Sequence, residues 1–146
     1  MTHAYNESYT HLAQKNLAIF LDYAVNVLKL DIKDAWKTFL DSPISSRFME
    51  GDPFVLAGRS GIEMVFDVLQ RDLDEYKEYP IRNSRTEEYW LGYYLAYFQW
   101  ETNVSFHTLD EYISINEMLS MYHPYHEMDV TSFVDELNKR LKKRKG

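Results

Sequence analysis

Residues 89–100 read YWLGYYLAYFQW and carry seven aromatic rings in twelve positions. Ser84 and Glu87 precede this stretch with the spacing of a capping box, in which a Ser oxygen and a Glu carboxylate each accept a hydrogen bond from a backbone N–H at a helix start. The pattern predicts a helix with rings over most of its circumference. One neighbouring helix cannot cover them all. We therefore expect this helix to lie at the centre of a bundle, or to leave one edge for a partner.

The rings have a structural and a functional interpretation. In the first, they fill the core and the Tyr hydroxyls reach its rim. In the second, they form a surface for another protein, because Tyr and Trp dominate the binding energy of interfaces. The candidate protein-interaction residues are Trp90, Tyr93, Tyr94 and Tyr97. Gly92 and Ala96, four positions apart, form a small-residue strip that lets another helix approach closely.

Further helix starts follow from residues that cap helices. Ser, Thr and Asp accept hydrogen bonds from the free N–H groups of a first turn, and Pro fits the first helical position. The predicted starts are at Asp31, at Ser42-Pro43, at Asp52-Pro53, at Ser60 with Glu63, and at Thr108 with Glu111. A long first helix is expected from Asn6 or Ser8 to about Lys29, and the last helix is expected to begin between Asp129 and Ser132.

Strand signals are weak. No segment alternates apolar and polar residues for long, and the only candidate strand is the stretch 104–106. The sequence predicts an all-α protein in which residues 1–146 form a single compact bundle. We expect five main helices, with the aromatic-rich one at the centre, plus two short helices between Ser42 and Gly58.

Composition excludes several classes of protein. The absence of Cys rules out disulfides, thiolate zinc sites and thiol nucleophiles. No apolar run approaches the ~18 residues that span a bilayer, so no membrane partner is expected. The polar N-terminus does not resemble a secretory signal, and a cytoplasmic location is the expectation.

Charge is unevenly distributed. The net charge is −7, but six of the sixteen basic residues lie in a basic C-terminal helix end at 139–146, so residues 1–138 hold ten basic and twenty-three acidic residues. Such a body repels nucleic acid, and contact with phosphates is expected only through the basic tail, whose charges also complement a helix dipole. Base stacking on the rings needs basic surroundings, and only Arg82 and Arg85 lie near them.

An anion-binding site is the second candidate. Guanidinium groups beside a helix N-terminus can hold an anion, and the residues that fit this description are Arg47, Arg59, Ser60 and Arg85. Ser60 and Glu63 could instead simply cap their helix. No phosphate-loop pattern is present.

No metal, cofactor or catalytic set is predicted. His107, His123 and His126 include a close pair with nearby acids, but Pro124 interferes with placing both imidazoles on one helical face. Surface histidines are the simpler interpretation. Neither a nucleophile elbow nor a paired-acid motif occurs.

Two blocks of the chain resemble a family of small, uncharacterised, all-helical bacterial proteins. The first begins with YAVN at Tyr23 and runs to Leu69, and the second begins with RTEEYWLG at Arg85 and runs to Trp100. Arg59 departs from the family pattern, where the resemblance leads us to expect Met. The resemblance implies genes beside those of toxin-like proteins, including ADP-ribosyltransferase-like ones. It thereby implies an antitoxin-like or accessory role, and it assigns no catalytic residue.

Three functional hypotheses follow. The first is a non-enzymatic interaction or regulatory protein with another protein, or a second copy of itself, as partner. The alternative is a small enzyme or anionic-ligand-binding domain with a pocket near Arg59 and Arg85. The last is an acidic protein that mimics nucleic acid. It is the least favoured, because the carboxylates are scattered along the chain and do not form rows.

Overall fold

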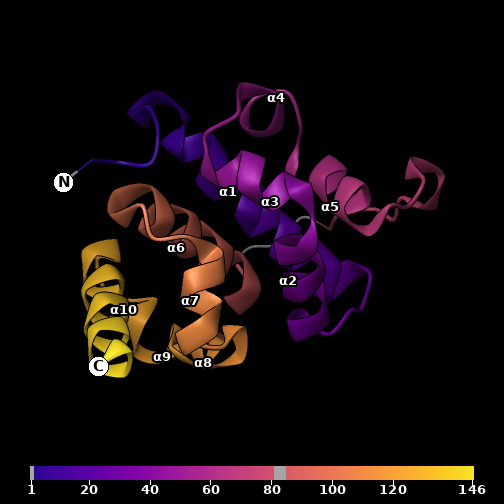
Figure 1. Cartoon of the computed structure of the whole chain (residues 1–146). Coiled ribbons are helices and arrows are strands. Elements are labelled where there is room, and N and C mark those ends of the chain that lie inside the picture. Colours follow the sequence, from indigo (N-terminus) through magenta and orange to yellow (C-terminus); the bar gives the residue numbers. More distant parts are fainter. Residues whose placement is uncertain (1, 81–84) are drawn as a thin grey trace.

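A computed structural model describes residues 2–80 and 85–146 of the chain, and within these residues it contains helices and no strand (Figure 1). The prediction of an all-α protein is therefore confirmed for the described part of the chain. The ten α-helices are α1 (Thr10–Asp22), α2 (Ile32–Asp41), α3 (Pro43–Met49), α4 (Pro53–Leu56), α5 (Gly61–Leu69), α6 (Glu87–Thr102), α7 (Phe106–Tyr112), α8 (Ile115–Ser120), α9 (Tyr122–Tyr125) and α10 (Val130–Lys145).

Short helical turns flank α1 and follow α5. A 3₁₀ turn, Glu7–Tyr9, precedes α1 and is capped by Asn6, and another covers Leu73–Glu75. The helix predicted to reach Lys29 changes to π-helix over Tyr23–Val27, and Lys29 has a left-handed φ of 62°. The expected count of five main and two short helices is not confirmed, because residues 106–125 form three short helices.

Most predicted caps are present. The side chains of Asp31, Ser42, Asp52 and Asp129 each accept a hydrogen bond from the first turn of the following helix, and Ser60 and Glu63 form the reciprocal capping box. These local hydrogen bonds fix where the helices begin, independently of how the helices later pack.

One prediction near residue 105 is wrong. The cap of α7 is Ser105, whose Oγ accepts a hydrogen bond from the N–H of Thr108, so Thr108 lies inside the helix and does not start it. The stretch 104–106, which offered only a weak strand signal, contains this cap and the first residue of α7. The predicted start at Ser84 lies outside the described residues, and the side chain that caps α6 is that of Thr86.

The centre of the fold is the contact between α1 and α6. Gly92 of α6 lies directly against the backbone of Leu17 and Ala18, as the small-residue strip predicted. Leu91, Leu95 and Phe98 are completely buried, and Figure 1 shows α6 between α1 on one side and α10 on the other. α6 is therefore covered from two sides, which is what its ring of aromatic residues requires.

The segment between α5 and α6 is held against the end of α1. The Tyr23 hydroxyl donates to the carbonyl of Lys77 (2.7 Å) and accepts from its N–H (2.8 Å). Asp22, which is buried, accepts hydrogen bonds from the Tyr79 hydroxyl (2.6 Å) and the Thr86 hydroxyl (2.7 Å). These bonds fix the position of Arg85 and the start of α6.

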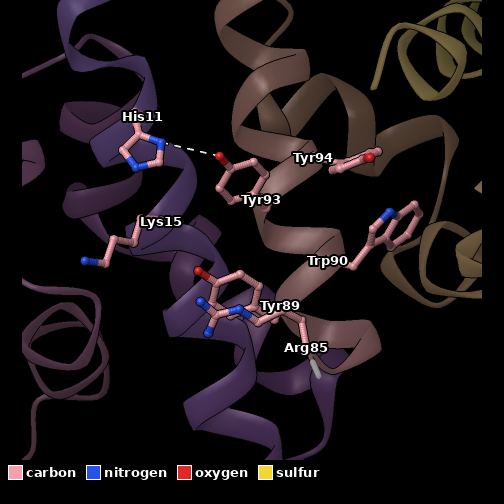
Figure 2. A pocket seen from close by; sticks show the side chains of 7 residues that line it. All are labelled: His11, Lys15, Arg85, Tyr89, Trp90, Tyr93 and Tyr94. Carbon is pink, nitrogen blue, oxygen red and sulfur yellow. Dashed lines mark hydrogen bonds between the residues drawn. The ribbon is translucent and has the colours of Figure 1, made fainter. Parts of the chain in front are cut away.

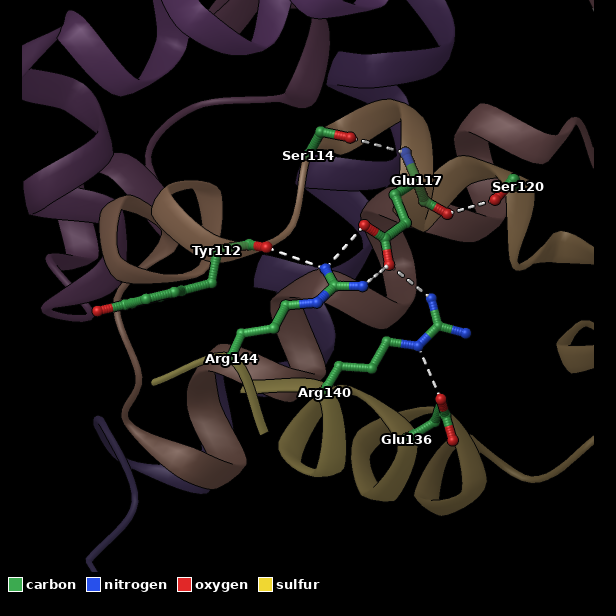
Figure 3. Close-up of polar contacts among 7 residues, drawn as sticks. All are labelled: Tyr112, Ser114, Glu117, Ser120, Glu136, Arg140 and Arg144. Carbon is green, nitrogen blue, oxygen red and sulfur yellow. Dashed lines mark hydrogen bonds and ion pairs between the residues drawn. The ribbon is translucent and has the colours of Figure 1, made fainter. Parts of the chain in front are cut away.

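The basic C-terminal end divides into two faces. Arg140 and Arg144 turn toward Glu117 of α8, with N–O distances of 2.8 Å, and Arg140 also pairs with Glu136 (Figure 3). The four lysines of this end stay exposed. No helix in the described part of the chain combines the length and apolar character that crossing a membrane requires.

Candidate functional site

A groove of about 500 Å³ runs over the surface that α1 and α6 share (Figure 2). Its lining consists of three basic residues and four aromatic ones: His11, Lys15, Arg85, Tyr89, Trp90, Tyr93 and Tyr94. We call this feature the α1–α6 groove. It contains three of the four residues predicted to contact a protein, together with one of the four predicted to hold an anion.

The aromatic wall of the groove comes from successive turns of α6. The Tyr89 and Tyr93 rings are near-parallel, with centroids 6.3 Å apart and planes 17° apart. Trp90 and Tyr94 pack their rings against Phe133 of α10, and the Tyr94 hydroxyl donates to the carbonyl of Met128 (3.2 Å). Tyr89 and Trp90 are buried, whereas Tyr93 and Tyr94 are half-buried. The Tyr93 and Tyr94 rings are therefore the more accessible part of the aromatic wall, whereas Tyr89 and Trp90 belong mostly to the core.

The charged wall is basic. The Arg85 guanidinium lies over the Tyr89 ring, 4.2 Å from its centroid (Figure 2). His11 Nδ1 shares a hydrogen bond with the Tyr93 hydroxyl at 3.3 Å. No carboxylate lines the groove, and none among the described residues forms an ion pair with Lys15 or Arg85. Lys15 and Arg85 therefore bring two positive charges to a groove whose described lining contains no acidic side chain.

The tyrosines of the groove add no negative charge. Burial raises the pKa of Tyr89 and of Tyr94 above the ordinary phenol value. Both side chains therefore stay neutral through the physiological range. The permanent charge of the groove is that of Lys15 and Arg85.

The other predicted anion-binding arginines lie outside the groove, and their positive charges are paired with carboxylates. Arg47 and Arg59 line a separate pocket of about 510 Å³ between α3, α4 and α5. Arg47 pairs with Asp52 (2.8 Å), and Arg59 pairs with both Glu63 (3.5 Å) and Asp67 (3.3 Å).

Backbone N–H groups at the helix start at Ser60 already have hydrogen-bond acceptors within the chain. The Glu63 carboxylate accepts the N–H of Ser60 (3.1 Å), and this hydrogen bond contributes most to holding the pKa of Glu63 below its usual value. The capping interpretation of Ser60 therefore fits better than the anion-binding one. Among the described residues, Arg85 lines the α1–α6 groove and Arg59 lines the separate pocket between α3, α4 and α5.

Tyr97, His107, His123 and His126 do not line the groove. The Tyr97 ring packs on Trp100, and its hydroxyl donates to Glu101 at 3.5 Å. His107 Nε2 donates to the carbonyl of Leu40 (2.7 Å), and the His126 ring stacks on Tyr122. Within residues 2–80 and 85–146, no three His, Asp or Glu side chains are arranged to hold a metal ion.

His11 and Lys15 are the groove residues that the sequence analysis missed. They lie four positions apart on α1, so they share one face of that helix. That spacing was the available signal, but nothing in the sequence shows which helix this face approaches.

Comparison with known proteins adds no assignment, since no family model, curated protein or solved structure matches the chain.

Proposed function

We propose that this protein is a non-catalytic binding protein whose α1–α6 groove receives the anionic group of a small ligand. The observation that carries the proposal is the pair of uncompensated cations, Lys15 and Arg85, beside four aromatic rings. The proposal keeps the anionic-ligand hypothesis from the sequence and moves it away from Arg59.

The contrast between cations supports the choice of groove. Arg47, Arg59, Arg140 and Arg144 each have a carboxylate partner. Arg85 instead contacts a ring through the face of its guanidinium, which leaves the N–H edges for an anion. Those edges match a carboxylate or phosphate in a two-point hydrogen bond.

The shape of the groove also suits a small ligand. Pockets for small molecules usually enclose about 300–1,000 Å³ and combine apolar walls with a few polar groups. The α1–α6 groove has about 500 Å³, ring-lined walls and basic groups at its edge. A ligand there would contact both α1 and α6, and would stabilise the central helix pair.

Thermal unfolding in the presence of a panel of carboxylates and phosphates tests the proposal. A ligand at a hundred times its dissociation constant adds about 2.7 kcal/mol to the free energy of unfolding, so the midpoint rises by several degrees. Arg85→Gln and Lys15→Gln should each remove most of that rise, because each removes a charge-assisted hydrogen bond.

Arg59→Gln is the matched control, since it removes a cation that already has carboxylate partners. It should leave the ligand-induced rise unchanged. If no anion raises the midpoint of the wild-type protein, or if Arg59→Gln abolishes the rise and Arg85→Gln does not, the proposal is wrong.

A second candidate function is interaction with a protein through the surface around Phe54. The Phe54 ring is 78% exposed, and it borders the pocket that Ile44, Val55 and Met64 line between α3, α4 and α5. An exposed ring beside a pocket on one surface suits a two-fold dimer, in which each copy inserts its ring into the other. The antitoxin-like role rests on the resemblance alone and stays a prediction.

Light scattering during size-exclusion chromatography tests this second candidate. A dimer of the wild-type protein that Phe54→Ser converts to a monomer is the expected result. Leu73→Ser, at another exposed apolar side chain, is the control and should leave the dimer intact. A monomeric wild-type protein at high concentration would exclude this form of interaction.

A further inference from the structure

We infer that the ligand of the α1–α6 groove is a phosphate monoester joined to a flat ring system, of the nucleoside monophosphate type. This inference rests on the proposed function and specifies the class of its ligand. The charge of the groove indicates the phosphate, and the arrangement of its rings indicates the flat group.

The charge of the groove matches a dianion. Lys15 and Arg85 supply two permanent positive charges, and His11 adds a third when protonated. A phosphate monoester carries about −1.5 to −2 charges at pH 7, whereas a carboxylate carries one. With no acidic side chain in the lining, a phosphate neutralises both cations and a single carboxylate leaves one of them unpaired.

The rings of the groove suit a flat partner. Tyr89 and Tyr93 lie one turn apart on α6, and their planes differ by only 17°. Arg85 covers one face of Tyr89, while Tyr93 and Tyr94 remain half-buried. Figure 2 shows Tyr93 one turn beyond Tyr89, the ring over which the Arg85 guanidinium lies, and on the same side of α6. A ligand with its phosphate at Arg85 could therefore reach the Tyr93 ring with a flat ring of its own, and stacking of this kind tolerates any base.

The charge of the whole molecule favours a single nucleotide over a strand. Residues 1–138 hold twenty-three acidic and ten basic residues, which repels a polyanion that extends beyond the groove. The exposed lysines lie on α10, which packs on the side of α6 away from α1 (Figure 1). A mononucleotide places its one phosphate at the groove, whose lining contains no carboxylate among the described residues.

Isothermal titration calorimetry at low salt tests the inference with three probes: adenosine 5′-monophosphate, inorganic phosphate and adenosine. The monophosphate should bind at least tenfold more tightly than either of the other two, because only it uses both the cations and the rings. Tyr93→Leu keeps the apolar bulk but removes the flat face. It should weaken the monophosphate about tenfold and leave inorganic phosphate unchanged. Arg85→Gln should weaken both phosphates, and Arg59→Gln should weaken neither.

The other outcomes separate this inference from the proposed function. If inorganic phosphate binds as tightly as the monophosphate, the ligand needs no flat ring, and only the proposal of anion binding remains. If adenosine binds as tightly as the monophosphate, or if carboxylates bind and phosphates do not, the inference that the ligand carries a phosphate is wrong. If a short oligonucleotide binds more tightly than the monophosphate, the ligand is a strand. If no anion binds at all, the proposed function falls together with the inference.

Discussion

Gly92 is the residue on which the central helix pair depends. A Cβ at this position would collide with the carbonyl oxygen of Leu17 and would lie 2.6 Å from Ala18 Cα, a distance that real side chains do not tolerate. The obstacle is backbone, which cannot rotate away as a flexible side chain can. The groove exists because α1 and α6 approach this closely, and their neighbouring side chains then share one surface.

Gly92→Ala therefore separates packing from helix propensity. Propensity alone predicts that Ala in a helix interior stabilises the protein by about 1 kcal/mol relative to Gly. The contact with α1 predicts the opposite sign, a loss of about 1 to 3 kcal/mol. Urea unfolding measures the difference in the free energy of unfolding between the two proteins. A more stable Gly92→Ala protein would contradict the close approach.

Glu117 is the second residue with a calculable effect. Arg144 and Arg140 hold the pKa of its carboxyl below the usual value, mainly through the hydrogen bond from Arg144. A carboxyl with a lowered folded pKa stabilises the protein fully above the unfolded value of about 4.3, and this stabilisation is lost as the pH falls through the folded pKa. The attachment of α10 to α8 should therefore weaken in acid.

Glu117→Gln should lower the free energy of unfolding at pH 7 by about 1 to 2 kcal/mol, because two arginines lose their carboxylate. The difference from wild type should shrink below about pH 4, where the wild-type carboxyl takes up a proton. Chemical unfolding at a series of pH values measures both effects. Glu111→Gln, at an exposed position of α7, is the control and should have no effect. A pH-independent difference would contradict the ion-pair explanation.

At the scale of elements, one hydroxyl provides two of the hydrogen bonds that hold the segment between α5 and α6. Tyr23 is completely buried, and its hydroxyl satisfies both the N–H and the carbonyl of Lys77. The Tyr76 ring lies nearly parallel to the Tyr23 ring, with centroids 6.2 Å apart. These contacts tie an otherwise exposed stretch to the end of α1.

Tyr23→Phe should release this stretch and keep the core, because the ring remains and only the two hydrogen bonds are lost. Limited trypsin digestion followed by mass spectrometry should show faster cleavage after Lys77. Tyr9→Phe is the control, because no hydrogen bond to its hydroxyl occurs among the described residues. Unchanged cleavage after Lys77 in Tyr23→Phe would mean that the hydroxyl does not hold the segment.

Helix starts show how far local sequence determines structure. The caps at Asp31, Ser42 and Ser60 were predictable because a capping side chain bonds to backbone within its own turn. The start of α7 was not. Ser105 and Thr108 both offer a capping oxygen, and the choice follows from Phe106, which is completely buried against Trp36, Phe39 and Phe48. That contact joins α7 to α2 and α3, so a local pattern could not reveal it.

At the scale of the whole molecule, the site was predictable only in part. The sequence identified Trp90, Tyr93, Tyr94 and Arg85 from their residue types, and all four line the α1–α6 groove. It grouped Arg85 with Arg59, which lies in another pocket, and it missed Lys15 and His11. The reason is the same in each case: the pairing of α1 with α6 decides which side chains meet, and that pairing is tertiary.

The most direct test of the account is a ¹H–¹⁵N NMR titration of the wild-type protein with adenosine 5′-monophosphate. We predict saturable shifts in the amide signals of Lys15, Arg85, Tyr89 and Tyr93, with those of Arg47, Phe54 and Arg59 unchanged. Shifts centred on Arg59, or a spectrum that does not respond to the nucleotide or to any other anion, would contradict the assignment of the α1–α6 groove as the binding site.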